Sequence, residues 1–244
     1  MQSKRGRLDR FISKKLQVSI KQVQVMLAKK QVWVDGNAVI ARDFPIDEFS
    51  HICVDGETLQ RNLPSYIMLH KPVGVVSATR DRQHRTVIDC LAAPELNTSN
   101  MNITDLHIVG RLDLNTSGLL LLTNDGRWSS ALMSPENKVE KVYRVALKNP
   151  LTLDYIAAFA QGMYFAYEDI TTLPAELEII SEHVAQVTLI EGRYHQIKRM
   201  FGRFRNPVVA LHRISVGEIV LDSHLPAGHY RKLTSPEIAL KALP

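Results

Sequence analysis

The stretch GRLDLNTSGLLLLTN, Gly110–Asn124, places an ionisable carboxylate a few residues before a continuous run of four leucines. The run, Leu119–Leu122, is short, follows a glycine and precedes Asn-Asp-Gly, so we expect a buried strand that ends in a turn. The largely polar segment Leu114–Ser117 predicts another turn before the strand. Asp113 would then lie on a loop beside a core strand, where catalytic side chains are often found. Its carboxylate could equally cap a turn or helix.

Length and composition are typical of a soluble globular protein with one large domain or two smaller ones. The chain has 244 residues, of which 45% are hydrophobic, a usual fraction for such proteins. No apolar run approaches the length of a membrane span. The basic N-terminus lacks the apolar region of a secretory signal. We therefore expect a cytoplasmic monomer with no membrane partner.

The cysteines and histidines form no metal-binding pattern. We expect Cys53 and Cys90 to be reduced, buried thiols, although the two could in principle pair. His51 and His84 are isolated, with no CxxC or HxxxH spacing nearby. The sequence thus predicts no metal site.

Positive charge is concentrated in two segments. The net charge is +5, yet residues 1–30 hold nine Lys or Arg and one acid, so that this segment alone carries +8. The second cluster consists of Arg193, Lys198, Arg199, Arg203, Arg205 and Arg213. Charge localised in this way suggests a polyanionic partner, either nucleic acid or a membrane surface. The alternative is a solvated charged face with no partner.

The N-terminal residues predict a compact unit of helices and hairpins. Apolar residues recur at helical spacing from Leu8 to Leu16. Ser19 can cap a second helix. Asp35-Gly36 and Asp55-Gly56 each predict a tight turn between two short strands.

Polar, proline-containing residues separate this unit from a longer one. The apolar strand Tyr66–Leu69 and the strand Lys141–Leu147, in which apolar and basic residues alternate, are interspersed with helical segments, which indicates a second domain of mixed α/β class. We therefore expect a first domain at 1–61, a linker at 62–65 and a second domain at 66–244.

The segment EGRYHQIKRMFGRF, residues 191–204, predicts an amphipathic helix. On a helix at 195–204, four apolar residues from Ile197 to Phe204 fall within about 100° of arc. Arg199 and Arg203 point to the opposite side, where they could meet phosphates. Lys198 lies on the flank of the apolar stripe, so it can bury its stem and present its ammonium at the domain's edge.

These motifs together resemble a known family. GRLDLNTSGLLLLTNDG resembles the signature of the RsuA-type pseudouridine synthases, and EGRYHQIKRMF resembles their later basic motif, with KVYRV between the two. The N-terminal RLDRFIS…VSIKQVQVMLAKKQVWVDG resembles the S4 RNA-binding module of the same family. The resemblance implies an α+β protein with a small S4-like helix-helix-hairpin module. A larger catalytic domain would follow, built on a mixed, mostly antiparallel sheet.

The resemblance also implies roles for four residues. Asp113 matches the catalytic aspartate, which acts as nucleophile or base on the ribose side of a uridine. Lys198 matches its basic partner, which keeps the carboxylate ionised. Tyr143 in KVYRV matches the tyrosine that stacks on the base. Arg111 matches the arginine that helps to hold the target nucleotide out of its helix.

The implied activity is the isomerisation of a specific uridine in ribosomal RNA. The tripeptide Tyr194-His195-Gln196 is most similar to the corresponding residues of the family member that modifies 16S RNA. The expected partner is therefore 16S RNA or a small-subunit assembly intermediate. The reaction has no redox or group-transfer step, so no cofactor is expected. The residues expected to contact RNA are Arg7, Arg10, Lys14, Lys15, Lys21, Lys29, Lys30, Arg193, Arg199 and Arg203.

Three other functions compete with this hypothesis. A large-subunit (23S) enzyme of the same family would share every motif. A non-catalytic RNA-binding protein would need only the basic helices. A nucleotide glycosidase would break the same C–N bond, but it normally uses a second carboxylate, and the chain offers no obvious partner of that kind to Asp113.

Overall fold

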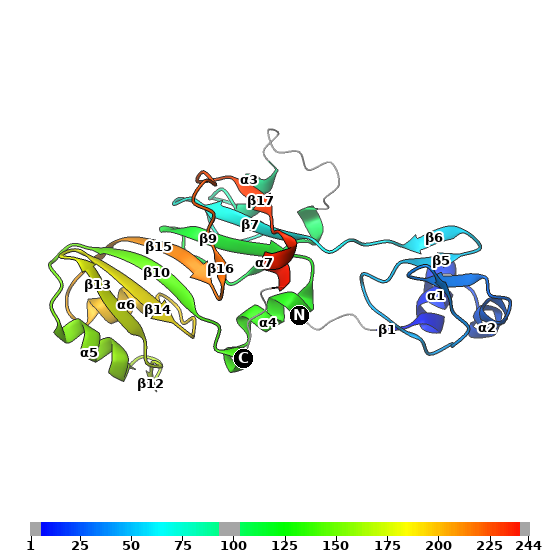
Figure 1. The fold of residues 1–244 in the computed structure, drawn as a ribbon, viewed down its shortest axis with the longest axis horizontal. Helices are drawn as coiled ribbons and strands as arrows, with labels where there is room; N and C mark the ends of the chain where they lie inside the picture. Colours follow the sequence, from blue (N-terminus) through cyan, green and yellow to red (C-terminus); the bar gives the residue numbers. More distant parts are fainter. Residues whose placement is uncertain (1–5, 93–102, 240–244) are drawn as a thin grey trace. The chain divides into compact units, whose positions relative to one another are not determined.

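The computed structural model describes residues 6–92 and 103–239, and its internal contacts divide these residues into two units (Figure 1). The first unit contains residues 6–64 together with 125–127, and the second contains 65–124 and 128–239. Each unit has its own hydrophobic core. No helix in the described ranges has the length and apolar character needed to cross a bilayer.

The first unit packs two helices against a small antiparallel sheet. Ser19 caps the second helix in a capping box with Gln22, as its position predicts. Leu8 and Ile12 of the first helix and Val23 and Leu27 of the second are buried in one core. The helices are α1 (Leu8–Leu16) and α2 (Ile20–Ala28). The strands of this sheet are β2 (Val32–Val34), β3 (Asn37–Ala38), β5 (Ile52–Val54) and β6 (Glu57–Gln60), and a separate two-stranded sheet pairs β1 (Gly6–Arg7) with β4 (Pro45–Ile46).

Both predicted Asp-Gly hairpins are confirmed. β2 pairs with β3, and β5 pairs with β6, in a sheet of order β3-β2-β5-β6. Asp35 and Gly36 have φ of 50° and 80°, and Asp55 and Gly56 have φ of 51° and 85°. Two successive positive φ angles are what a two-residue hairpin turn requires.

The second unit is built on one nine-stranded sheet. Its main path runs β13-β14-β10-β15-β9-β7-β17, with β16 paired to β15 and β8 paired to β9. Among the strand pairs of this sheet in the described residues, only β9–β15 is parallel, so the mixed, mostly antiparallel sheet is confirmed. Its strands are β7 (Tyr66–Lys71), β8 (His107–Val109), β9 (Thr116–Thr123), β10 (Lys141–Leu147), β13 (Glu176–Ser181), β14 (Val184–Leu189), β15 (Val208–Val216), β16 (Ile219–Val220) and β17 (Tyr230–Lys232).

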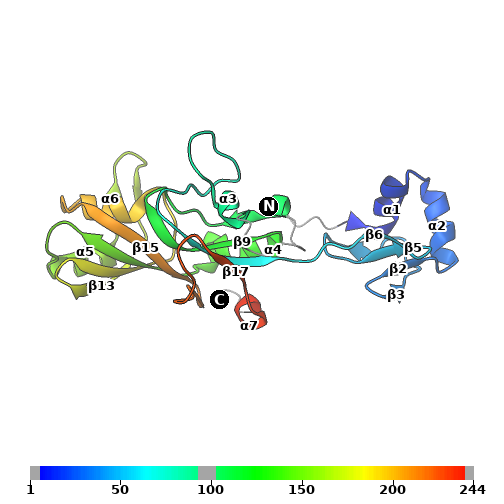
Figure 2. The ribbon, with the colours of Figure 1, turned by 90° about the horizontal axis from the view of Figure 1, so that it is seen from above.

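Short helices cover this sheet (Figure 2). A small hairpin forms a separate two-stranded sheet. The α-helices are α3 (Val87–Leu91), α4 (Gly126–Met133), α5 (Asp154–Gln161), α6 (Gln196–Gly202) and α7 (Ser235–Ala239). Two 3-10 turns lie at Ile103–Asp105 and Pro135–Asn137. The separate hairpin pairs β11 (Tyr164–Phe165) with β12 (Ile170–Thr171).

The leucine run forms the centre of β9 because both faces of that strand are covered. Leu120 and Leu122 pack in the cluster that contains Val87 and Leu91 of α3. Leu119 and Leu121 pack in the cluster that contains Trp128 and Leu132 of α4. A strand buried on both faces reads as a continuous apolar run without alternation.

The turn before the leucines is shorter than the sequence predicts. The expected turn spans Leu114–Ser117, but β9 already begins at Thr116. Gly118, expected at the boundary of the strand, lies inside it with φ of 108°. A Cβ added there would lie 2.3 Å from the carbonyl oxygen of Arg213. A glycine is therefore required at this close approach of β9 and β15.

Candidate active site

Asp113 and Lys198, 85 residues apart in the sequence, form an ion pair. Lys198 Nζ lies 3.1 Å from Asp113 Oδ2. Asp113 lies on the loop between β8 and β9, and Lys198 lies in the first turn of α6. Apolar residues of α6, including Ile197, Met200 and Phe201, are buried against the sheet. The helix thereby directs Lys198 toward the loop, as its flank position predicts.

A second lysine, Lys71 at the end of β7, holds the backbone of the Asp113 loop. Its side chain is fully buried. Its Nζ donates to the carbonyl oxygens of Asp113 at 3.0 Å, Thr116 at 2.7 Å and Pro72 at 3.1 Å. The amide of Thr116 also donates to the carbonyl of Asp113 at 3.0 Å, which closes a tight turn. One buried ammonium thus fixes both ends of the turn that carries the carboxylate.

Residues just after Lys71 complete the support of the loop. Ser77 Oγ donates to the carbonyl of Leu112 at 2.7 Å and accepts from its amide at 3.0 Å. The amide of Gly74 donates to the carbonyl of Leu114 at 2.9 Å. Hydrogen bonds from the segment between Lys71 and Ser77 therefore hold the loop on each side of Asp113.

Burial lowers the pKa of Lys71 from 10.5 to about 8, against the opposing effect of the Asp113 charge. Repulsion from Arg213 and Lys198 lowers it further. The Lys71 ammonium nevertheless has three carbonyl acceptors, which satisfy its three donors.

His195 also lies beside the carboxylate. Its Nε2 is 3.3 Å from Asp113 Oδ2, the same oxygen that Lys198 contacts. It occupies the N-cap position of α6, and its ring stacks on Tyr194 with centroids 3.9 Å apart. Lys198 thus donates a hydrogen bond to one oxygen of Asp113, and the His195 imidazole lies within ion-pair distance of the same oxygen.

Tyr143 and Arg111 are near the site in different ways. Tyr143 on β10 is half-buried and packs against both clusters that border the site, the one with Leu112 and the one with Ile197. The Arg111 side chain is exposed on the Asp113 loop. Within residues 6–92 and 103–239, neither forms a hydrogen bond or ion pair with Asp113.

The basic residues of the first unit are mostly solvent-exposed. Arg7 is also exposed, but it forms two hydrogen bonds with the buried carboxylate of Asp9, at 2.6 and 3.1 Å. This pairing lowers the pKa of Asp9. Lys4 and Arg5 lie outside the described residues. The exposed residues expected to contact RNA are Arg10, Lys14, Lys15, Lys21, Lys29 and Lys30.

Several arginines of the second basic cluster already have protein partners. Arg193 Nε lies 2.8 Å from Glu191. Arg199 pairs with Glu168 and lies over the ring of Phe165. Arg203 is exposed after α6. Arg213, which the sequence placed in this cluster, is buried, and its Nε donates to the carbonyl of Leu119 at 2.8 Å. It is therefore a structural residue of the sheet.

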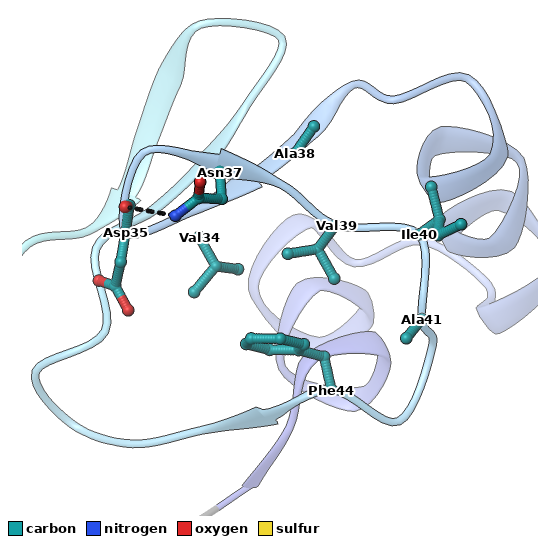
Figure 3. A pocket seen from close by; sticks show the side chains of 8 residues that line it. All are labelled: Val34, Asp35, Asn37, Ala38, Val39, Ile40, Ala41 and Phe44. Atoms are coloured by element: carbon teal, nitrogen blue, oxygen red, sulfur yellow. Dashed lines mark hydrogen bonds between the residues drawn. The ribbon is translucent and has the colours of Figure 1, made fainter.

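A hollow of about 430 Å³ lies on the first unit (Figure 3). Its walls are mainly apolar, and Asp35 is its charged residue. It is lined by Val34, Asp35, Asn37, Ala38, Val39, Ile40, Ala41 and Phe44. It contains none of the residues expected to act on or contact RNA, and its single acid does not suit a phosphate.

The two cysteines are free and lie in different environments. Cys90 is buried in α3, and burial raises the pKa of its thiol. Cys53, expected to be buried, is only half-buried, because its side chain lies on the sheet face that also carries the exposed Trp33. Over the described ranges, no three His, Cys, Asp or Glu side chains gather as a metal site would need.

Lys71 and His195 were not found from the sequence. The signal for Lys71 is a lysine at the end of an apolar strand, His70-Lys71-Pro72, but nothing local shows that it is buried. The signal for His195 is its place three residues before Lys198, where it precedes the helix.

Comparison with known proteins gives one consistent result. A family described as RNA pseudouridylate synthase matches residues 65–202. The ribosomal small subunit pseudouridine synthase A of Pseudomonas aeruginosa is 48% identical over 233 residues, 95% of this chain and 98% of that protein. The protein of the same name from Escherichia coli K12 is 42% identical and covers 96% and 98%. A crystal structure of a pseudouridylate synthase is 37% identical with a TM-score of 0.68, over 97% of this chain and 99% of that one.

Proposed function

The chain belongs to the RNA pseudouridylate synthase family, and we propose that it isomerises one uridine of small-subunit ribosomal RNA to pseudouridine. Family membership confirms the resemblance of the two motifs. The substrate rests on the near full-length similarity to the small-subunit enzymes. A cytoplasmic location follows from that substrate.

The observation that carries the proposal is the Asp113–Lys198 pair on a braced loop. In the reaction the bond between C1′ and N1 breaks, the base turns, and a bond forms between C1′ and C5. The proton of C5 is lost, and N1 gains one, so nothing is gained or lost overall. Asp113 acts on the ribose side as nucleophile or base, which requires its ionised form. Lys198 stabilises that form by its charge.

Two further residues handle the target nucleotide. Tyr143, at the junction of the two clusters that border the site, stacks on the base. Arg111, exposed on the same loop as Asp113, helps to hold the nucleotide out of its helix. Extrusion of a base costs a few kcal/mol, which stacking and phosphate contacts offset.

RNA recognition is divided between the two units. We assign residues 1–61 to an S4-like RNA-binding module and residues 66–244 to the catalytic domain. The exposed basic residues on α1, on α2 and just after α2, from Arg10 to Lys30, supply most of the phosphate attraction, because few acidic residues lie among them. Arg7, Arg193 and Arg199 contribute less, since each has an acidic partner. Arg203 is exposed and adds a contact beside the site.

The test uses purified protein and unmodified RNA labelled with tritium at C5 of uridine. Isomerisation releases the label, and the product has the same mass as uridine, so release is the direct readout. We expect release from 16S RNA or a small-subunit assembly intermediate at one position. Release of tritium from 23S RNA alone would refute the proposed substrate. Tight RNA binding with no release from any of these would overturn the catalytic proposal, and release of free base would indicate a glycosidase.

A further inference from the structure

The segment EGRYHQ, Glu191–Gln196, forms a turn that is braced by its own side chains. Glu191 Oε1 accepts from Gln196 Nε2 at 2.7 Å and from the amide of Leu173 at 2.8 Å. Glu191 Oε2 accepts from Arg193 Nε at 2.8 Å, and Gln196 Oε1 accepts from the amide of Arg193 at 3.1 Å. Gln196 is buried, with 3% of its surface exposed. None of these hydrogen bonds involves the side chain of Tyr194 or His195.

His195 occupies an unusual backbone position at the end of this turn. It has φ of 49° and ψ of 30°, the left-handed region, which is uncommon for residues other than glycine. An N-cap residue normally has extended backbone and uses its side chain to cap the helix. His195 makes no such capping hydrogen bond. Strained positions of this kind persist where the surroundings fix them, and they often serve a site.

The contacts of the imidazole are with the site and with Tyr194. Nε2 lies 3.3 Å from Asp113 Oδ2, and Lys198 Nζ lies 3.1 Å from the same oxygen. The His195 ring is stacked on the ring of Tyr194, with an interplanar angle of 22°. We propose that His195 is a positioning residue: its Nε2 lies close to Asp113 Oδ2 in the free protein, and it donates its Nε2–H to that oxygen once the substrate is bound, since catalytic hydrogen bonds are often long before the substrate binds.

Lys198 and His195 act on the carboxylate in different ways. A lysine ammonium is a compact charge on a flexible stem, so Lys198 attracts the carboxylate without fixing its plane. A stacked imidazole is rigid, and its N–H direction is set by the ring. Once both residues donate to Oδ2, the carboxylate no longer rotates freely about Cβ–Cγ, and the reacting oxygen stays in one place. Misplacement of a reacting group by about 1 Å can cost roughly 100-fold in rate.

This inference rests on the proposed function of Asp113 and extends it to a residue that works through the aspartate. The Nε2–H donor is present in both the neutral and the charged imidazole, given the tautomer that a carboxylate acceptor selects. Charge on His195 is therefore not required, and a neutral donor at the same reach should replace it.

The test is single-turnover release of tritium from C5-labelled substrate RNA, which separates the chemical step from RNA binding. His195→Asn keeps a residue that tolerates the left-handed backbone but is too short to reach Oδ2. We expect its chemical step to slow by roughly 30- to 100-fold, with RNA Kd within about threefold of wild type. His195→Gln places an amide N–H near the position of Nε2 and should recover most of the rate. His224→Asn, a 96% exposed histidine beside Asp222, is the matched control.

The outcomes separate cleanly. An unimpaired His195→Asn, or one that loses only RNA affinity, overturns the inference. Equal inactivity of His195→Asn and His195→Gln at every pH from 5.5 to 9, with unchanged thermal unfolding, also overturns it, because the donor alone would then not suffice. A wild-type protein that releases no tritium would refute the proposed function, which is a different result.

Discussion

Lys71 Nζ donates a hydrogen bond of 3.0 Å to the main-chain carbonyl of Asp113, across 42 residues of sequence. The same ammonium donates to the carbonyl of Thr116 at 2.7 Å. The lysine therefore fixes the backbone that carries the carboxylate, while the carboxylate oxygens remain for Lys198, His195 and substrate. Loop support and charge stabilisation come from two separate lysines.

Lys71→Met should lower both stability and activity. Methionine fills a similar volume, but it leaves the carbonyls of Asp113 and Thr116 buried without their donor. An unsatisfied buried acceptor costs about 1–3 kcal/mol, and relief of the buried charge offsets part of that loss. We expect a fall of about 2 kcal/mol in the free energy of unfolding at pH 7 and at least a ~10-fold loss of rate. Urea denaturation and tritium release measure these two effects. An equally stable and active variant would show that the loop holds itself; exposed Lys232→Met is the control.

The pKa of Lys71 predicts how stability changes with pH. It is about 8 in the folded protein, against an ordinary value of 10.5. Between these values the unfolded chain binds more protons than the folded one, so stability rises with pH in that window. From pH 7.5 to 9.5, wild type should gain about 2 kcal/mol relative to Lys71→Met, at 1.36 kcal/mol for each unit. Urea denaturation of both proteins at both pH values tests this, and a constant or shrinking difference would contradict it.

Asp113→Asn should abolish pseudouridine formation and leave RNA binding nearly intact. The amide cannot act as nucleophile or base, yet it is close in shape to the carboxylate. We expect at least a ~10³-fold loss of rate, because a reactive group is removed and not merely displaced. RNA affinity should stay within about threefold, since an anionic carboxylate is not expected to bind a phosphate. Activity within tenfold of wild type would remove Asp113 from its assigned role.

Gly118→Ala should prevent normal folding of the second unit. The added Cβ would lie 2.3 and 2.5 Å from backbone atoms of Arg213, and φ of 108° is itself unfavourable for alanine. The β9–β15 pair would have to separate, and the Asp113 loop precedes β9. We expect a destabilisation of several kcal/mol, seen as a lower Tm. Gly192→Ala has open space around its Cβ and no positive φ, so it is the control. A wild-type Tm for Gly118→Ala would argue against this strand pairing.

Reversal of charge on α1 should weaken RNA binding in a salt-dependent way. Arg10, Lys14 and Lys15 are exposed there, and each basic side chain that binds a phosphate releases counterions. The triple change to Glu should reduce the slope of log K against log salt by about one for each phosphate that the variant no longer binds. The chemical step at saturating enzyme should change little. An unchanged slope would mean that these residues form only a solvated surface.

Local patterns in the sequence determined the elements and the class of chemistry. The four leucines predicted β9, the two Asp-Gly pairs predicted the hairpins, and the apolar stripe after His195 placed Lys198 on the flank of α6. The Asp113 motif identified the family. These inferences succeed because periodicity, turn geometry and a contiguous motif are all properties of neighbouring residues.

Only the tertiary structure decided what surrounds the carboxylate. Nothing near Lys71 in the chain shows that its ammonium is buried under a loop 42 residues away. The parallel pairing of β9 with β15, which forces glycine at 118 and buries Arg213, joins segments nearly one hundred residues apart. His195 reaches Asp113 from a left-handed backbone position that propensity would not assign to it. A single sequence records which residues favour burial or a turn, but it does not record which distant carbonyl or carboxylate each one meets, because that follows from how the strands pair and the helices pack.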